Sequence, residues 1–169
     1  MTRSFAHRLD RLARDMTPVA ITFLLALIAI VPLGIPYYSS VAPGLVIASV
    51  FYWSVYRPDL MPRVAVFALG LLLDLLSGHP LGLNVAVLLF VNWLSVGQRR
   101  AIIGKPFFIA WGGFMLIAAG AGGVACALAL VLTAKPILVA PVLFQYLLTF
   151  AQFPLLAWAL IGAHRHFVR

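Results

Sequence analysis

The hydrophobic positions of this chain form long runs, and short polar or proline-containing stretches separate them. Apolar runs of roughly 17 to 25 residues are long enough for a helix to cross a membrane. The pattern predicts an all-α fold with six apolar helices. Their expected ranges are about Thr17–Ile35, Val41–Tyr56, Pro62–Ser77, Leu81–Val96, Pro106–Thr133 and Ile137–Gly162.

Composition favours an integral membrane protein. Of 169 residues, 64% are hydrophobic and only 9% are charged, so little of the chain remains for a water-exposed surface. The connections between runs are a few residues long, which excludes a separate soluble catalytic domain. We expect a basic cytoplasmic N-terminal segment (1–16), one six-helix transmembrane domain (17–163) and a cytoplasmic tail (164–169).

The net charge of +8 is explained by membrane orientation rather than by nucleic acid, because the Lys and Arg residues lie at the ends of the runs. Eleven of the 12 fall in the N-terminus, the second and fourth connections and the tail. Only Lys135 falls on the other side. The positive-inside rule therefore predicts six spans with both termini in the cytoplasm.

Three features of this topology have alternatives. The second to fourth runs are short for a perpendicular span, so the third and fourth could form a re-entrant hairpin without changing the charge count. We favour two full spans, because a turn exposed to lipid is not tolerated. The first run is longer than the apolar region of a usual signal peptide, so we expect a retained helix. Residues 1–16 form either an amphipathic helix on an anionic leaflet or a basic flank.

Asp74 is the only acidic residue inside an apolar run, and we expect the stretch from Gly70 to Asn84 to organise the fold. Gly70, Asp74 and Gly78 share one helix face, so a neighbouring helix can approach the carboxyl closely. Asn84 is the best-placed partner across the Gly-His-Pro turn, with Asn92 and Ser95 further along. A structural carboxyl is favoured over a partner contact and over a proton or ion site.

Small residues mark one side of the fifth run. Gly113, Gly120 and Ala127 recur every seven residues, and Ala119 and Gly123 form a small-xxx-small pair. Such residues let helices approach closely in lipid. Packing within the bundle is favoured, and docking of a partner's transmembrane helix is the alternative.

On the sixth run, Gln145, Thr149 and Gln152 form a polar stripe at helical spacing. Hydrogen bonds between helices are the favoured role, and contact with a small substrate is the alternative.

Enzyme and cofactor signatures are missing from the sequence. There is no HExxH motif, no Walker loop and no glutamate, and the single cysteine, Cys126, excludes an internal disulfide or a Cys-based zinc pattern. We therefore expect a protein without catalytic activity, metal or cofactor.

The region from Tyr52 to Trp93 resembles the rod shape-determining protein MreD family. It contains Arg-Pro-Asp, Gly-x-x-x-Asp and Pro-Leu-Gly-Leu-Asn in the order and spacing of that family, although His79 replaces a small or hydroxyl residue before the proline. The residues that match by position are Arg57, Pro58, Asp59, Gly70, Asp74, Gly78, Pro80, Gly82 and Asn84.

This resemblance implies a non-enzymatic, multi-pass protein of the bacterial inner membrane that belongs to the cell elongation (Rod) complex. The main implied partner is MreC. Through it the protein would be connected to MreB filaments, to the RodA glycosyltransferase and to a class B penicillin-binding transpeptidase. The implied fold is similar to the six-helix substrate-binding (S) subunits of energy-coupling-factor transporters. A vitamin-capture subunit of such a transporter is therefore the alternative function.

Overall fold

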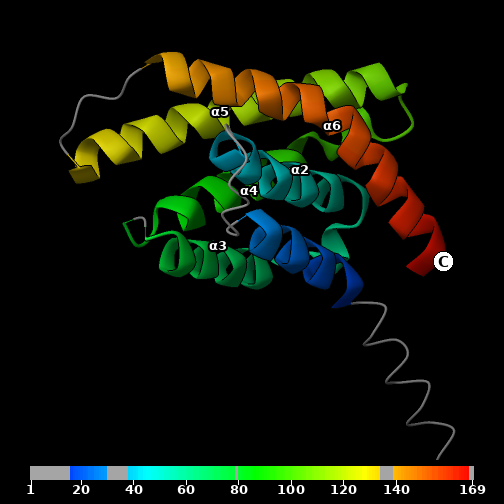
Figure 1. Cartoon of the computed structure of the whole chain (residues 1–169). Coiled ribbons are helices and arrows are strands. Elements are labelled where there is room, and N and C mark those ends of the chain that lie inside the picture. The colour runs from blue at the N-terminus through cyan, green and yellow to red at the C-terminus, as the bar shows by residue number, and fades with distance from the viewer. Residues whose placement is uncertain (1–15, 30–37, 79, 134–138, 168–169) are drawn as a thin grey trace, which may run out of the picture.

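The structure is a computed structural model that describes residues 16–29, 38–78, 80–133 and 139–167 (Figure 1). Over these ranges the chain forms α-helices and one short 3-10 turn, with no strand, which confirms the expected all-α class. The elements are the helix Met16–Ala29, α2 (Tyr38–Tyr56), η1 (Pro58–Leu60), α3 (Arg63–Ser77), α4 (Leu83–Ile102), α5 (Phe107–Thr133) and α6 (Val139–Phe167).

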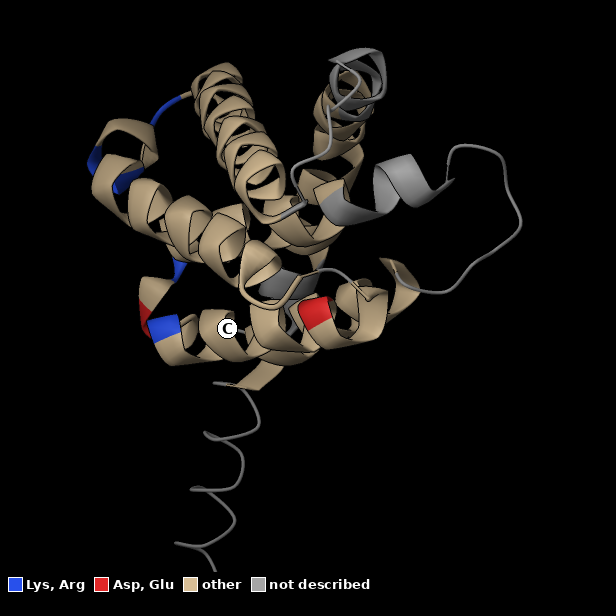
Figure 2. Cartoon of the chain, turned by 90° about the vertical axis from the view of Figure 1, so that its left-hand side faces the viewer, with Lys and Arg blue, Asp and Glu red and all other residues tan. Residues whose placement is uncertain are grey.

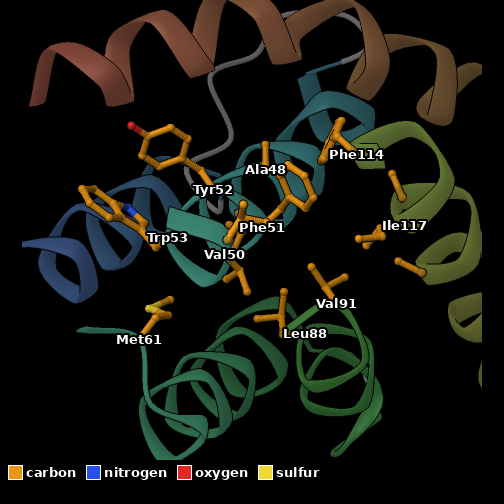
Figure 3. Close-up of a cluster of buried hydrophobic side chains, with 14 of the residues drawn as sticks. Ala48, Val50, Phe51, Tyr52, Trp53, Met61, Leu88, Val91, Phe114 and Ile117 are labelled. Atoms are coloured by element: carbon orange, nitrogen blue, oxygen red, sulfur yellow. The ribbon is translucent and has the colours of Figure 1, made fainter. Parts of the chain in front are cut away.

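Helix α2 is the centre of the bundle, with the α5–α6 pair on one side and the α3–α4 hairpin on the other (Figure 1). Its second half is buried on every side, as expected only for a helix surrounded by others. Figure 3 shows Phe51 of α2 directed toward Phe114 and Ile117 of α5, while Val50 faces Leu88 of α4. The buried α2 positions are Gly44, Val46, Ala48, Ser49, Val50, Phe51, Tyr52, Trp53, Ser54 and Val55.

The expectation that Gly70–Asn84 organises the fold is therefore wrong for the hydrophobic core, which is built around α2. Three aromatic rings hold α2 against α5 and α6. The rings of Phe114 and Phe153 are stacked with centroids 4.1 Å apart, and Phe51 lies 5.3 Å from Phe114 and 5.7 Å from Phe153.

Buried polar groups also tie α2 to its neighbours. The hydroxyls of Thr22 and Ser49 are 2.8 Å apart, which joins the helix Met16–Ala29 to α2. The Asn92 amide of α4 donates to the Ser54 hydroxyl of α2 at 2.8 Å. Each pair satisfies groups that would be costly to bury alone.

Helices α5 and α6 run antiparallel, and a proline shapes their contact. Pro154 lies inside α6 and has no N–H, so the carbonyl of Phe150 loses its usual partner in the helix. The indole Nε1–H of Trp111 on α5 donates to this carbonyl at 3.4 Å, and the rings of Trp111 and Phe150 stack with centroids 4.5 Å apart.

Several helix ends differ from the sequence expectation. Helix α4 continues to Ile102, whereas a connection was expected from Gln98 onward. Arg99 and Arg100 lie in its last turn, where positive charge stabilises the carboxyl end of a helix. The helix ends where Ile103 takes an extended conformation, and Gly104 follows in a left-handed one. Helix α6 also runs past the expected Gly162, to Phe167. The first helix begins at Met16, next to the expected Thr17, whereas its expected end at Ile35 and residues 1–15 lie outside the described residues.

Within the described ranges, one helix segment, Phe107–Leu132, is long and apolar enough to cross a membrane on length and composition. The segments Met16–Ala29, Gly44–Tyr56 and Tyr146–Gly162 are apolar but shorter.

Basic positions gather along one side of the bundle (Figure 2). They lie at the carboxyl ends of α2 and α4 and at the amino ends of α3 and α5. These residues are Arg57, Arg63, Arg99, Arg100 and Lys105.

Candidate functional site at the turn between α3 and α4

The carboxylate of Asp74 connects the end of α3 to the beginning of α4. Its Oδ2 accepts the backbone N–H of Gly82 at 2.8 Å, and its Oδ1 accepts the backbone N–H of Asn84 at 2.9 Å. The side chain is only 1% exposed. An ionised carboxylate only accepts hydrogen bonds, and here each oxygen receives a backbone donor.

Asp74 therefore caps a helix from outside that helix. Gly82 is the N-cap residue of α4, but it has no side chain to satisfy the first N–H groups of the helix. The negative charge also lies at the positive end of the α4 dipole. Hydrogen bonds to charged groups contribute about 1.5 to 3 kcal/mol each, so this contact is a main stabiliser of the turn.

Gly70 brings the two helix backbones together one turn before Asp74. A Cβ atom at this position would lie 2.6 Å from the Cα and 2.9 Å from the backbone nitrogen of Val85. No side chain fits there. The structure thus places Gly70 where the sequence predicted close approach, and the approach brings the amino end of α4 within reach of the carboxylate.

Gly78 has a different role from the one predicted. It ends α3 in the left-handed conformation, with φ of 65°, and a Cβ there would meet nothing within 4 Å. It is needed for its backbone angle and not for helix packing. Gly82 also has a positive φ, 99°, so both ends of the turn use glycine conformations.

The polar side chains predicted near Asp74 do not reach it. Asn84 contributes its backbone N–H, as does Gly82, which the sequence did not identify as a partner. Asn92 instead bonds to Ser54, and the Ser95 hydroxyl donates to the Val91 carbonyl within α4. Gly82 could have been considered from the sequence, because it carries a backbone N–H and lies across the short turn that follows Asp74.

The Arg57-Pro58-Asp59 motif lies at the opposite end of α3 and forms a second turn. The backbone N–H of Leu60 donates to the Arg57 carbonyl at 3.1 Å, and that of Met61 donates to the Pro58 carbonyl at 3.2 Å. Pro58 follows the end of α2, and η1 reverses the chain into α3. At the other turn, Pro80 accepts the N–H of Leu83 at 3.2 Å, whereas His79 lies outside the described residues.

The small residues of α5 divide into two groups. Gly113 faces Ile102 and Gly120 faces the ring of Phe90, both on α4, with a Cβ at either position 3.1 to 3.2 Å from the nearest side-chain atom. These two positions serve packing within the bundle. Gly112 and Gly123 are exposed. A Cβ added at either position would meet no atom within 4 Å.

The polar stripe of α6 packs against α2. A Cβ at Gly44 would lie 2.4 Å from the Thr149 hydroxyl and 2.3 Å from the Gln152 amide nitrogen. The sequence interpretation missed Gly44, although an isolated glycine within an apolar run is a sign of close packing. The side chain of Gln145 lies outside the described part of the chain.

Residues that could together bind a metal ion do not gather in the ranges that the structure describes. No three His, Cys, Asp or Glu side chains gather there as a metal site would require. Asp74 is buried and both of its oxygens are engaged, which suits a structural carboxylate better than an acid or base that exchanges protons with a substrate.

Comparison of the chain with family models, with curated proteins and with solved structures gave no match.

Proposed function

We propose that this protein is a non-enzymatic, multi-pass scaffold of the bacterial inner membrane, a subunit of the elongation complex of the MreD type. The observation that carries the proposal is the α3–α4 hairpin. Four of the residues that resemble the family, Gly70, Asp74, Gly82 and Asn84, make one contact network there. This network fixes the relative position of two helices and offers no reactive group.

The proposed membrane location is supported by the apolar surface of the bundle. Several large hydrophobic side chains are exposed on each described α-helix apart from the central α2, including Leu75 (64%), Leu116 (64%) and Trp158 (79%). In water such a surface would drive aggregation, whereas in a bilayer it contacts lipid tails. The basic side shown in Figure 2 is then the cytoplasmic side, in keeping with the positive-inside rule.

The proposed place for the transmembrane helix of MreC is the outer side of α5. Gly112, Ala119, Gly123 and Ala127 are exposed there, and the last three are spaced four residues apart. A partner helix can approach the α5 backbone closely at these positions, which favours dispersion contacts in lipid.

The vitamin-capture alternative is less well supported. Its motivation was the implied six-helix architecture together with the polar stripe on α6. In that stripe, however, Thr149 is buried against Gly44 of α2 and Gln152 lies beside it. Tight binding of a vitamin by the purified protein, together with an associated ATPase complex, would favour that function.

The proposal is tested by depletion and by a pair of matched variants. Depletion of the protein is expected to turn rod-shaped cells round. Gly123→Leu is expected to abolish both rescue of the rod shape and co-purification of MreC. Gly97→Leu is the control, because Gly97 is also an exposed helical glycine at which an added Cβ would meet nothing within 4 Å.

Rod-shaped cells after depletion would contradict the proposed function as a whole. Equal MreC capture by both variants would contradict the assignment of the partner to α5.

A further inference from the structure

The two sides of the bundle present apolar surfaces of different height. Helix α3 has 15 residues and α5 has 27. At 1.5 Å per residue their lengths are about 22 Å and about 40 Å, against a hydrocarbon layer of about 30 Å. Exposed apolar side chains extend from Val64 to Leu76 on α3 and from Phe107 to Leu132 on α5. Helix α3 is therefore about 8 Å too short for an undisturbed bilayer.

The hairpin cannot correct this shortfall by moving. Tilting a helix reduces the height it spans, so tilt helps α5 but not α3. Pro62 precedes α3 and Gly78 ends it in a left-handed conformation, so neither end can extend. The Gly70 contact and the Asp74 hydrogen bonds fix α3 against α4, which prevents sliding.

The turn itself must lie near water. Ser77, Gly78, Leu81 and Gly82 are exposed, and both glycines lie outside helical geometry. Exposed turns with free backbone groups are not tolerated among lipid tails. The turn therefore marks the level at which the hydrocarbon layer ends on this side of the protein.

The two leaflets are not affected equally. At the basic end, the long side chains of Arg63 and Arg100 are exposed and can extend several ångströms toward the headgroups. At the turn, Ser77, Gly78 and Pro80 are short. Most of the shortfall must therefore be met by the leaflet on the turn side.

We propose that this protein thins the bilayer along α3 by drawing in the leaflet on the turn side, while the α5 face keeps the full thickness. The occupant of the α3 face is lipid, with a preference for short acyl chains. This inference depends on the membrane location proposed above. In the cell it would draw the protein toward thin membrane regions and toward other short-spanning proteins, because sharing a thinned zone lowers the total mismatch.

Depth measurements test the proposal. Single cysteines are placed at the exposed positions Val64 and Leu76 on α3 and Leu116 and Val131 on α5, in a Cys126→Ala background. Each carries a fluorophore in vesicles of dioleoyl phosphatidylcholine and phosphatidylglycerol with bromines at shallow or deep chain positions. We expect the labels at 64 and 76 to be quenched best by shallow bromines, with about 18 Å between them along α3. The label at 116 should be quenched best by deep bromines.

A second measurement varies the acyl chain from myristoleoyl to erucoyl. The melting temperature of the unlabelled protein should be highest in short chains, and the label at 76 should remain shallow even in erucoyl lipid.

Each contrary result has a distinct meaning. Deep quenching at both 76 and 116 would show a re-entrant hairpin in a membrane protein and would overturn the thinning proposal alone. Absence of deep quenching at 116 would overturn the membrane location as well. Protection of 64 and 76 from all bromines would show that protein, such as a second copy of the chain, covers α3 in place of lipid.

Discussion

At the scale of single residues, Asp74 shows how one side chain replaces a local helix cap. The N-cap residue of α4 is glycine because the turn needs a φ of 99°, and glycine has no side chain to accept the free N–H groups. The carboxylate of the preceding helix accepts them instead. The backbone angle and the distant acid therefore depend on each other.

Asp74→Ala is expected to lower the free energy of unfolding by about 2 to 4 kcal/mol, because two N–H donors lose a charged acceptor. Asp74→Asn keeps one acceptor oxygen but points an amide N–H₂ toward a donor, and its expected loss is smaller, about 1 to 3 kcal/mol. Thermal unfolding in detergent measures both. Equal stability of Asp74→Ala and the natural protein would contradict the capping role.

The hydrogen bond that Trp111 of α5 donates to the Phe150 carbonyl depends on Pro154 of α6, which leaves that carbonyl without its usual helical partner. Trp111→Phe keeps the stacked ring but removes the indole N–H, and we expect a loss of about 1 kcal/mol in the free energy of unfolding. In a Pro154→Ala background, the N–H restored at position 154 satisfies the Phe150 carbonyl. Trp111→Phe should then lower the free energy of unfolding by less than it does in the natural protein. A double-mutant cycle measures this coupling. A loss of equal size in both backgrounds would show that proline does not free the carbonyl for the indole.

At the scale of elements, glycines on different helices have different structural roles. Gly70 permits contact between the backbones of α3 and α4, whereas Gly123 on α5 faces open space. The sequence showed both as small residues at helical spacing and could not separate these roles. The difference depends on which neighbour lies opposite, and that is a property of the packed bundle.

Alanine substitution separates the two kinds of glycine. Gly70→Ala should lower the free energy of unfolding by about 1 to 3 kcal/mol, because the backbone of Val85 cannot move aside as a flexible side chain can. Gly123→Ala should be neutral or stabilising by up to about 1 kcal/mol, since alanine favours helix. Both are measured by thermal unfolding of the isolated protein. A stable Gly70→Ala variant would mean that α3 and α4 are not held at this distance.

At the scale of the whole molecule, a helix whose second half is buried lies between two helix pairs of different length. Helix α2 contacts both the α3–α4 hairpin and the α5–α6 pair. Helix α4 also packs directly against α5, so α2 and the α4–α5 contact together fix the relative position of the two pairs. The basic residues at one end and the Asp74 turn at the other then give the bundle a direction across the proposed membrane.

This direction is tested by cysteine labelling in intact cells, with Cys126→Ala as background. A cysteine in place of Leu81, which is 67% exposed in the turn, should react with a membrane-impermeant maleimide from outside. One in place of Lys105 should react only after the membrane is permeabilised. The reverse pattern would contradict the orientation inferred from charge, and labelling of neither position in intact cells would contradict the spanning hairpin.

The candidate site was partly predictable. An acid in an apolar run must find donors, so the pairing of Asp74 with the region of Asn84 followed from chemistry alone. Which groups donate did not follow, because backbone N–H groups are present at every position and only the turn geometry selects those of Gly82 and Asn84. Gly44 was missed for a related reason, since its partners lie on α6, far away in the sequence.

The sequence by itself determined the helical class, the approximate helix ranges and the placement of charge, because each depends on the local solvent preference of consecutive residues. Tertiary structure alone decided that α2 is the core, and that Gly78 provides a backbone angle while Gly70 provides contact. These properties depend on which segments meet in space. Distant segments meet through complementary shape and satisfied polar groups, and the order of residues along the chain does not show that match.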